Sequence, residues 1–189
     1  ETNPAQQPVT VVAGKRLEFF QNKIFREGEE VFAFDPGVGS AGLFYYAQGW
    51  LFFHVAKAND PDHKTFLYAC PWDTEEQQGP QIENAVVLPL TVPREFPYSY
   101  GQLDNAVFIG TNNGAVYRFK ERVFHTLREA SPNVSFQLYA MINYRNRLLM
   151  RQYPTGELFE IVGDEIVQLA GSPPRPANAS GTAREAQTL

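Results

Sequence analysis

The sequence predicts an all-β protein assembled from four-stranded antiparallel units of about 40 residues. The 189 residues include 15 Phe, 9 Tyr and 2 Trp, together with 14 Gly and 14 Pro. Aromatic residues favour strands, and Gly and Pro favour the tight turns that join short strands. A pattern of strands and turns also recurs along the chain at a spacing of 42 residues. The length indicates a single domain over residues 1–189.

The repeat is clearest in the second half of the chain. Residues 106–127 align without a gap on residues 148–169, and the turn at Gly114 falls on the turn at Gly156. Few letters are identical, so the repeat is one of pattern, in which β-branched and aromatic runs alternate with turn residues. Each aligned stretch predicts three strands, and an aromatic run upstream of it predicts a fourth.

Four units are predicted from this pattern. The first offers only three strands, at 9–12, 17–20 and 31–34, without an evident innermost strand, so it is a partial unit. The second has longer loops than the other units. In chain order the predicted units are 9–34, 43–90, 98–127 and 136–169, followed by a connecting segment at 170–189.

The third strand of the last two units carries a motif. Residues 114–119 read GAVYRF, and residues 156–161 read GELFEI. This pattern resembles the Gly-x-Leu/Val-Tyr/Phe-x-Phe strand of β-propeller blades, broadly the kelch-like and related bacterial multi-blade families. The resemblance covers about three quarters of the chain and implies a β-propeller fold. The paired glycines of kelch blades are missing, so no characterised activity transfers.

Two arrangements of the units are compatible with the sequence. The spacing of 42 places residues 144–147 on 186–189, at the position of an innermost strand. Residues 186–189 would then supply the strand that the first unit lacks and close a ring of four blades. Alternatively, the chain is a section of a larger propeller that a second chain completes. Residues 183–189 resemble an inter-blade segment of uncharacterised bacterial multi-blade proteins, which favours the second arrangement.

The propeller resemblance also implies where a ligand would bind. The loops between second and third strands, and those between blades, emerge on one face of a propeller, and that face usually binds. The loops expected there are 35–42, 57–64, 91–97, 112–114, 128–135 and 154–156.

The loop at 57–64 is the most polar of these. Asp60, Asp62 and His63 could coordinate a divalent cation or orient a sugar, because hard cations take carboxylate oxygens. Their spacing matches no calcium loop, and no second His lies near, so no metal site is predicted. The simpler interpretation is a solvated turn rich in Asn, Asp and Pro.

Arg94 is the second candidate, on an inter-blade loop stiffened by Pro93 and Pro97. Its guanidinium could pair with a ligand carboxylate through two hydrogen bonds. The alternative is an ordinary surface pair between Arg94 and Glu95, which would contribute almost nothing to stability.

Arg151 and Tyr153 form the third candidate. Arg151 replaces the aligned Ile109 at a strand position that should face a core. A residue that breaks a local rule often marks a functional site. An arginine near a strand end can also extend its head group to solvent, which is the alternative explanation.

Charge and composition restrict the kinds of partner and the cellular compartments that are compatible with the sequence. The formal charge of −5 argues against nucleic acid, and no apolar run is long enough to span a membrane. Cys70 stands alone, which excludes an internal disulfide and a thiolate zinc site, so a buried role is expected. A secreted or periplasmic protein is expected, and a cytoplasmic one is also compatible.

The sequence favours a binding or interaction module that recognises a protein or a carbohydrate through the loop face. It contains no nucleophile elbow, His-Glu-x-x-His motif, phosphate loop or dinucleotide fingerprint, and no cofactor is expected. A sugar-active hydrolase or lyase on a propeller scaffold is one alternative. A structural section of a larger assembly is the other.

Overall fold

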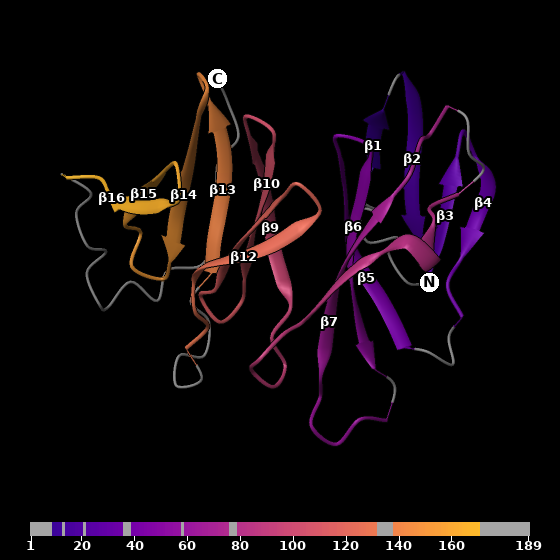
Figure 1. Ribbon diagram of the computed structural model, residues 1–189, viewed down its shortest axis with the longest axis horizontal. Coiled ribbons are helices and arrows are strands. Elements are labelled where there is room, and N and C mark those ends of the chain that lie inside the picture. The colour runs from indigo at the N-terminus through magenta and orange to yellow at the C-terminus, as the bar shows by residue number, and fades with distance from the viewer. Residues whose placement is uncertain are drawn as a thin grey trace, which may run out of the picture.

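The computed structural model describes residues 9–170 except 13, 21, 36–38, 58, 76–78 and 132–137. Within this described part the chain forms four antiparallel sheets of four strands each, and every sheet pairs its strands in chain order (Figure 1). The prediction of an all-β protein built from four-stranded antiparallel units is therefore confirmed. No helix among the described residues is long and apolar enough to cross a membrane.

Short loops join the strands within the first, third and fourth sheets, whereas the second sheet has longer loops between β6 and β7 and between β7 and β8. The first sheet contains β1 (Val9–Val12), β2 (Lys15–Phe20), β3 (Lys23–Arg26) and β4 (Glu29–Ala33). The second contains β5 (Gly39–Ala47), β6 (Trp50–Lys57), β7 (Thr65–Pro71) and β8 (Val86–Pro89), with the 3-10 helix η1 (Ile82–Asn84) before β8. The third contains β9 (Pro97–Leu103), β10 (Ala106–Thr111), β11 (Val116–Lys120) and β12 (Val123–Arg128). The fourth contains β13 (Leu138–Tyr144), β14 (Arg147–Tyr153), β15 (Leu158–Val162) and β16 (Glu165–Gln168).

The first unit is complete, so the prediction of a partial N-terminal unit is wrong. The strand that the sequence reading missed is β3, which has only four residues, two of them charged. It is bounded by Asn22 and Glu27, whose positive φ angles of 63° and 54° make the flanking turns. The first sheet therefore needs no strand from residues 186–189, which lie outside the described residues.

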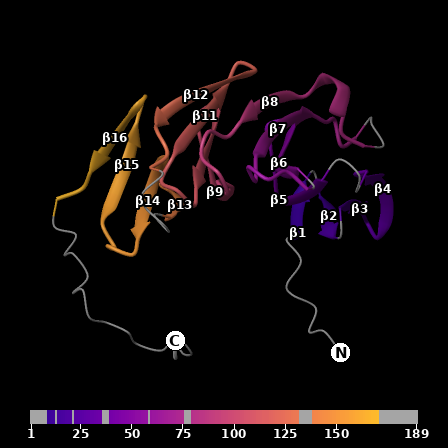
Figure 2. The same cartoon turned by 90° about the horizontal axis from the view of Figure 1, so that it is seen from below.

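The four sheets stand side by side along an arc. In Figure 2 the first strands (β1, β5, β9 and β13) lie toward the concave side, and the fourth strands lie toward the convex side. Consecutive first strands are in contact, as β1 is with β5, β5 with β9 and β9 with β13. The first and last sheets form the two separate ends of the arc (Figures 1 and 2).

The register of the last sheet differs by one residue from the aligned sheet before it. Ile109 pairs with Tyr117, so the spacing of 42 predicts Arg151 opposite Phe159. Instead, Met150 pairs with Phe159. A shift of one residue moves a side chain to the other face of a strand. Arg151 is accordingly exposed, and the prediction that its position faces a core is wrong.

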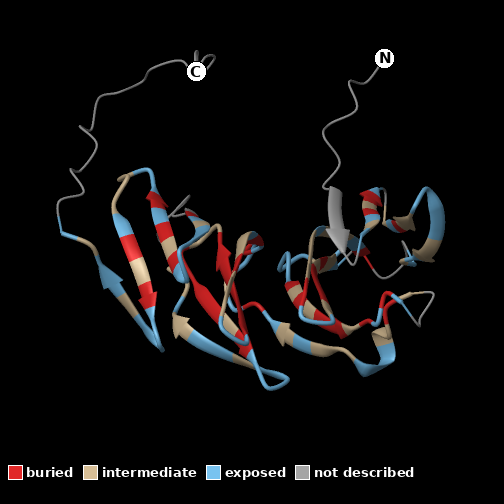
Figure 3. Ribbon diagram, turned by 90° about the horizontal axis from the view of Figure 1, so that it is seen from above, coloured by how far each residue is buried: buried red, intermediate tan, exposed pale blue. Residues whose placement is uncertain are grey.

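Buried side chains form three hydrophobic clusters, one between each pair of neighbouring sheets. The buried residues are coloured red along the strands in Figure 3. The second and third sheets meet through aromatic rings that include Phe52, Phe119 and Tyr100. The third and fourth sheets approach more closely, because a Cβ added at Gly101 would lie 2.5 Å from Cδ1 of Leu148. Each sheet is thus anchored on its neighbour by a separate core.

Cys70 lies in the core between the first and second sheets and is fully buried, as the sequence led us to expect. Burial raises the pKa of its thiol to about 12, and the nearby charge of Glu83 acts in the same direction. The thiol is therefore protonated at neutral pH.

Candidate functional site

The loop before β7 and the loop before β9 meet at the rim between the second and third sheets. The backbone N–H of Arg94 donates to the carbonyl of His63 at 3.2 Å, and the Arg94 guanidinium lies 3.4 Å from His63 Nε2. The two side chains therefore lie next to each other at this rim. We call Asp60, Asp62, His63 and Arg94 the rim cluster.

The two aspartates of the rim cluster shape their own loop. Asp60 Oδ1 accepts the backbone N–H of Asp62 at 2.9 Å, and the Asp60 carbonyl accepts that of His63 at 3.0 Å. Asp62 pairs with Lys64 at 3.0 Å, which raises the pKa of that amine. This is the usual behaviour of Asp in turns. In the described part of the chain, no group of three His, Cys, Asp or Glu side chains is placed to hold a metal.

Beneath the rim cluster, Glu95 is fully buried, so Arg94 and Glu95 do not form an ordinary surface pair. Its carboxylate accepts the Tyr117 hydroxyl at 3.1 Å and the backbone N–H of Val92 at 3.3 Å, and Thr111 supplies a further side-chain bond. Burial raises the pKa of Glu95, and these hydrogen bonds oppose the increase. Glu95 therefore fixes the loop from inside while Arg94 faces solvent.

A third loop holds Arg94 from the other side. Asn112, just after β10, donates from Nδ2 to the Arg94 carbonyl at 3.0 Å. Its Oδ1 accepts the backbone N–H of Phe96 at 2.8 Å. Arg94 has a φ of 60° and His63 a φ of 50°, the left-handed conformation that non-glycine residues seldom adopt. Three loops thus hold the backbone of the rim cluster in one conformation.

The guanidinium of Arg94 has no acidic partner among the described residues, and Arg94 is exposed, as is Phe96 two residues further along the chain, at 38%. An exposed arginine without an internal carboxylate is suited to bind a carboxylate, and an exposed aromatic residue nearby in the chain is suited to an apolar or sugar surface.

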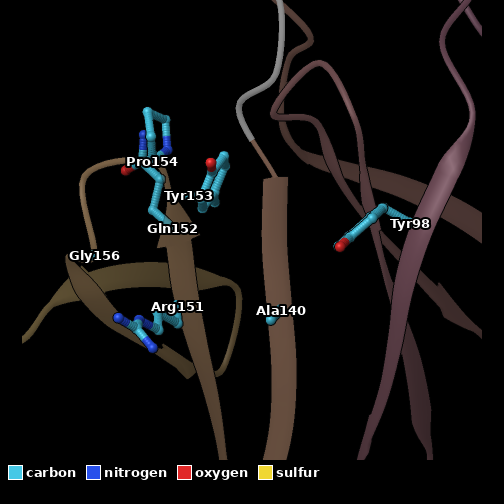
Figure 4. A pocket seen from close by; sticks show the side chains of 7 residues that line it. All are labelled: Tyr98, Ala140, Arg151, Gln152, Tyr153, Pro154 and Gly156. Carbon is cyan, nitrogen blue, oxygen red and sulfur yellow. The ribbon is translucent and has the colours of Figure 1, made fainter. Parts of the chain in front are cut away.

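Arg151 and Tyr153 line a different hollow, of about 370 Å³, between the third and fourth sheets (Figure 4). Both side chains come from β14, and Tyr98 from β9 lies on the opposite side. The Arg151 guanidinium has no acidic partner among the described residues and lies near Gly156, where a Cβ would be 3.8 Å from its nitrogen. The residues lining the hollow are Tyr98, Ala140, Arg151, Gln152, Tyr153, Pro154 and Gly156.

The structure therefore divides the sequence-predicted residues into two places. Asp60, Asp62, His63 and Arg94 come together at one interface, and Arg151 with Tyr153 lies at the next. Sequence reasoning missed the positioning residues Glu95, Asn112 and Tyr117, and also Tyr98. Tyr98 belonged to an aromatic run that was interpreted only as a strand, and Asn112 belonged to a turn, where a polar residue is expected without any function. No local pattern marks Glu95 as buried, because its partner Tyr117 lies on a distant strand.

The sequence matches no protein-family model and no curated protein. Among solved structures, the chain is similar to the crystal structure of the computationally designed Ika4 protein, with 10% sequence identity and a TM-score of 0.49. The similarity covers 85% of this chain and 94% of that chain.

Proposed function

We propose that this chain is a binding module of the β-propeller type that recognises a protein or a carbohydrate through the rim cluster. The propeller assignment is supported by the order of the strands, since first strands lie on the concave side of the arc and neighbouring sheets face one another. The rim cluster lies on loops at the ends of neighbouring sheets. Loops held by a rigid scaffold often carry binding residues, which supports a role in recognition.

The observation that carries the proposal is the exposed guanidinium of Arg94, which has no acidic partner among the described residues and extends from a backbone that two other loops hold. Its backbone is bonded to His63 on one side and Asn112 on the other, above the buried Glu95. A loop whose backbone is already ordered before binding loses less freedom when a ligand arrives, and this preorganisation favours affinity. An arginine offers paired donors that match a carboxylate. A carboxylate-bearing sugar or an acidic peptide is therefore the expected ligand.

The test is a binding array with matched probes. It would hold oligosaccharides with and without uronic acid residues, and peptides with and without acidic residues. We expect the chain to prefer the acidic member of at least one pair. Arg94→Ala should weaken that binding about tenfold or more, as loss of a charged hydrogen-bonding partner does.

Arg122→Ala is the matched control, because Arg122 lies in the turn between β11 and β12, away from the rim cluster. Both arginines are exposed, so both variants should keep the far-ultraviolet circular dichroism of the parent. Equal binding by the parent and Arg94→Ala would contradict the proposal, and so would an array on which no probe binds.

A further inference from the structure

A hollow of about 330 Å³ lies between the first and second sheets. Residues of β4, β5, β6 and β7 and of the short helix η1 line it. Its volume is at the lower end of the range for small-ligand pockets, about 300–1,000 Å³. It is separate from the rim cluster, which lies between the second and third sheets, and from the hollow at Arg151. We call this hollow the aromatic pocket.

Four aromatic rings from the two sheets line the aromatic pocket. Phe32 lies on β4 and Phe34 just after it, whereas Phe53 lies on β6 and Tyr68 on β7. The ring centroid of Phe34 is 4.9 Å from that of Phe32 and 4.7 Å from that of Phe53, with planes inclined at 73° and 59°. Tyr68 stacks on Phe53 with centroids 5.2 Å apart. Phe53 is 1% exposed, and the other three are half-buried. Rings set at such angles can present more than one face to a single bound group.

The charged residues that line the aromatic pocket are acidic. Asp35 and Glu83 are both exposed, so they lie at its mouth, and no Lys, Arg or His is among the described residues that line it. Glu83 forms no ion pair with another described residue. Its charge also helps to raise the pKa of Cys70, in the core between the same two sheets. The hollow at Arg151 is the opposite, since an arginine and no acid line it. The aromatic pocket therefore favours a cation.

The apolar lining of the aromatic pocket restricts the kind of cation that fits. A primary ammonium carries three N–H donors, and burying them without hydrogen-bond acceptors is costly. A quaternary ammonium has no N–H donor, and its positive charge is attracted to the faces of aromatic rings. Such a group therefore matches the aromatic pocket in two ways, because its charge complements the two carboxylates and its methyl groups complement the rings.

We propose that the aromatic pocket binds a quaternary ammonium group, carried either by a small molecule of the choline type or by a trimethylated lysine side chain. The methyl groups lie against the half-buried rings, above Phe53. Asp35 and Glu83 face the positive charge from the mouth. This site does not depend on the proposed role of the rim cluster, because the two share no residue.

Titration of the full chain with three related probes tests the proposal. The probes are choline, ethanolamine and the uncharged alcohol in which a carbon atom replaces the nitrogen of choline. Calorimetry measures the affinities, and the changes in amide chemical shift should gather around Phe34 and Tyr68. We expect choline to bind at least about tenfold more tightly than either other probe, because only choline combines a positive charge with an apolar surface.

Two variants test the groups that are expected to contact the cation. Glu83→Gln keeps the shape of the side chain and removes its charge, so the affinity for choline should fall about two- to fivefold while the affinity for the alcohol stays the same. Glu121→Gln is the matched control, because Glu121 is exposed in the turn between β11 and β12 and should change neither affinity. Phe34→Leu removes a ring and keeps an apolar side chain, so choline should bind about threefold more weakly or worse.

A peptide that carries trimethyllysine distinguishes the two sources of the group. Tighter binding of this peptide than of choline, and not of its unmethylated counterpart, identifies a modified protein, whereas tighter binding of choline identifies a small molecule. Arg94→Ala should leave choline binding unchanged, so the aromatic pocket and the rim cluster can fail separately.

Three results would overturn the proposal. They are equal affinities for choline and the uncharged alcohol, an absence of saturable choline binding at millimolar concentrations, and a folded Glu83→Gln chain that binds choline like the parent. If a variant fails to fold, the comparison of the three probes on the parent chain decides alone.

Discussion

The third sheet meets its two neighbours by different means. Toward the second sheet it presents Tyr100 and Phe119, which contact Phe52 with ring centroids 6.3 Å and 5.2 Å apart. Toward the fourth sheet it presents Gly101 and Gly110, and a Cβ at either would crowd Leu148 or Met141. The third sheet thus packs through large aromatic rings on one face and through close approach of its backbone on the other. The distance between two neighbouring sheets therefore depends on the size of the side chains between them, since protein interiors are close-packed.

The largest expected effect is on the aromatic interface. Phe52→Ala would leave a cavity among rings that cannot collapse into it, so the free energy of unfolding should fall by about 3–5 kcal/mol. Chemical denaturation measures this change. Phe20→Ala is the control, because Phe20 is 43% exposed and should lose less than about 1 kcal/mol. Equal losses at the two positions would contradict the assignment of Phe52 to the core.

The aromatic interface should also depend on pH through His54. Burial lowers the pKa of this imidazole from 6.5 to about 4. As the pH falls below 6.5, the unfolded chain takes up a proton that the folded chain does not, so the free energy of unfolding falls until about pH 4. The loss attributable to His54 is up to about 3 kcal/mol. Denaturation curves of the parent and His54→Gln between pH 7 and 4 should diverge, and parallel curves would contradict this.

At the glycine interface, added volume should destabilise the protein. Gly101→Ala would place a methyl group against Leu148, and overpacking of this kind costs about 1–3 kcal/mol. When Leu148→Ala is added, the new methyl group at position 101 occupies the space that the Leu148 side chain has left. The double variant should therefore be more stable than the sum of the single changes predicts. Strict additivity, measured by denaturation of all four proteins, would show that the close approach is not limiting.

The smallest effect is expected where the aromatic interface joins the rim cluster. Tyr117→Phe removes the donor to Glu95 and keeps the ring, so about 1 kcal/mol of stability should be lost. Tyr98→Phe is the control, since Tyr98 is 45% exposed and should change little. A Tyr117→Phe protein as stable as the parent would mean that Val92 and Thr111 satisfy the carboxylate unaided.

Much of the fold could be predicted because strands and turns are encoded locally. The Gly-containing turns at Gly114 and Gly156 and the aromatic runs around them predicted the third and fourth sheets, and the structure has both. β3 was missed because four residues with two charges carry too little pattern. The register of β14 was missed because the pairing of Met150 with Phe159 is decided between strands and not within either one.

The candidate site was less accessible to prediction. The propeller resemblance implied that the loops holding His63 and Arg94 would lie on one face, and the two residues are in contact. The buried carboxylate of Glu95 accepts a hydrogen bond from Tyr117, which lies on β11 and not near Glu95 in the sequence. The residues around Glu95 therefore do not predict its burial. Arg151 is separated from the rim cluster because it lies on β14 of the fourth sheet, and the one-residue register shift decides which face of β14 it occupies.

Because Cys70 is buried between the first two sheets, its reactivity can be used to measure how often these sheets separate. A thiol with a pKa near 12 in a closed core reacts with alkylating or disulfide reagents only while that core is open. Its modification rate under native conditions therefore reports the free energy of that opening without any probe being attached. At short reaction times the same protection leaves an engineered surface cysteine as the only labelled position, so fluorophores or spin labels can be placed on the described sheets without removing the native residue.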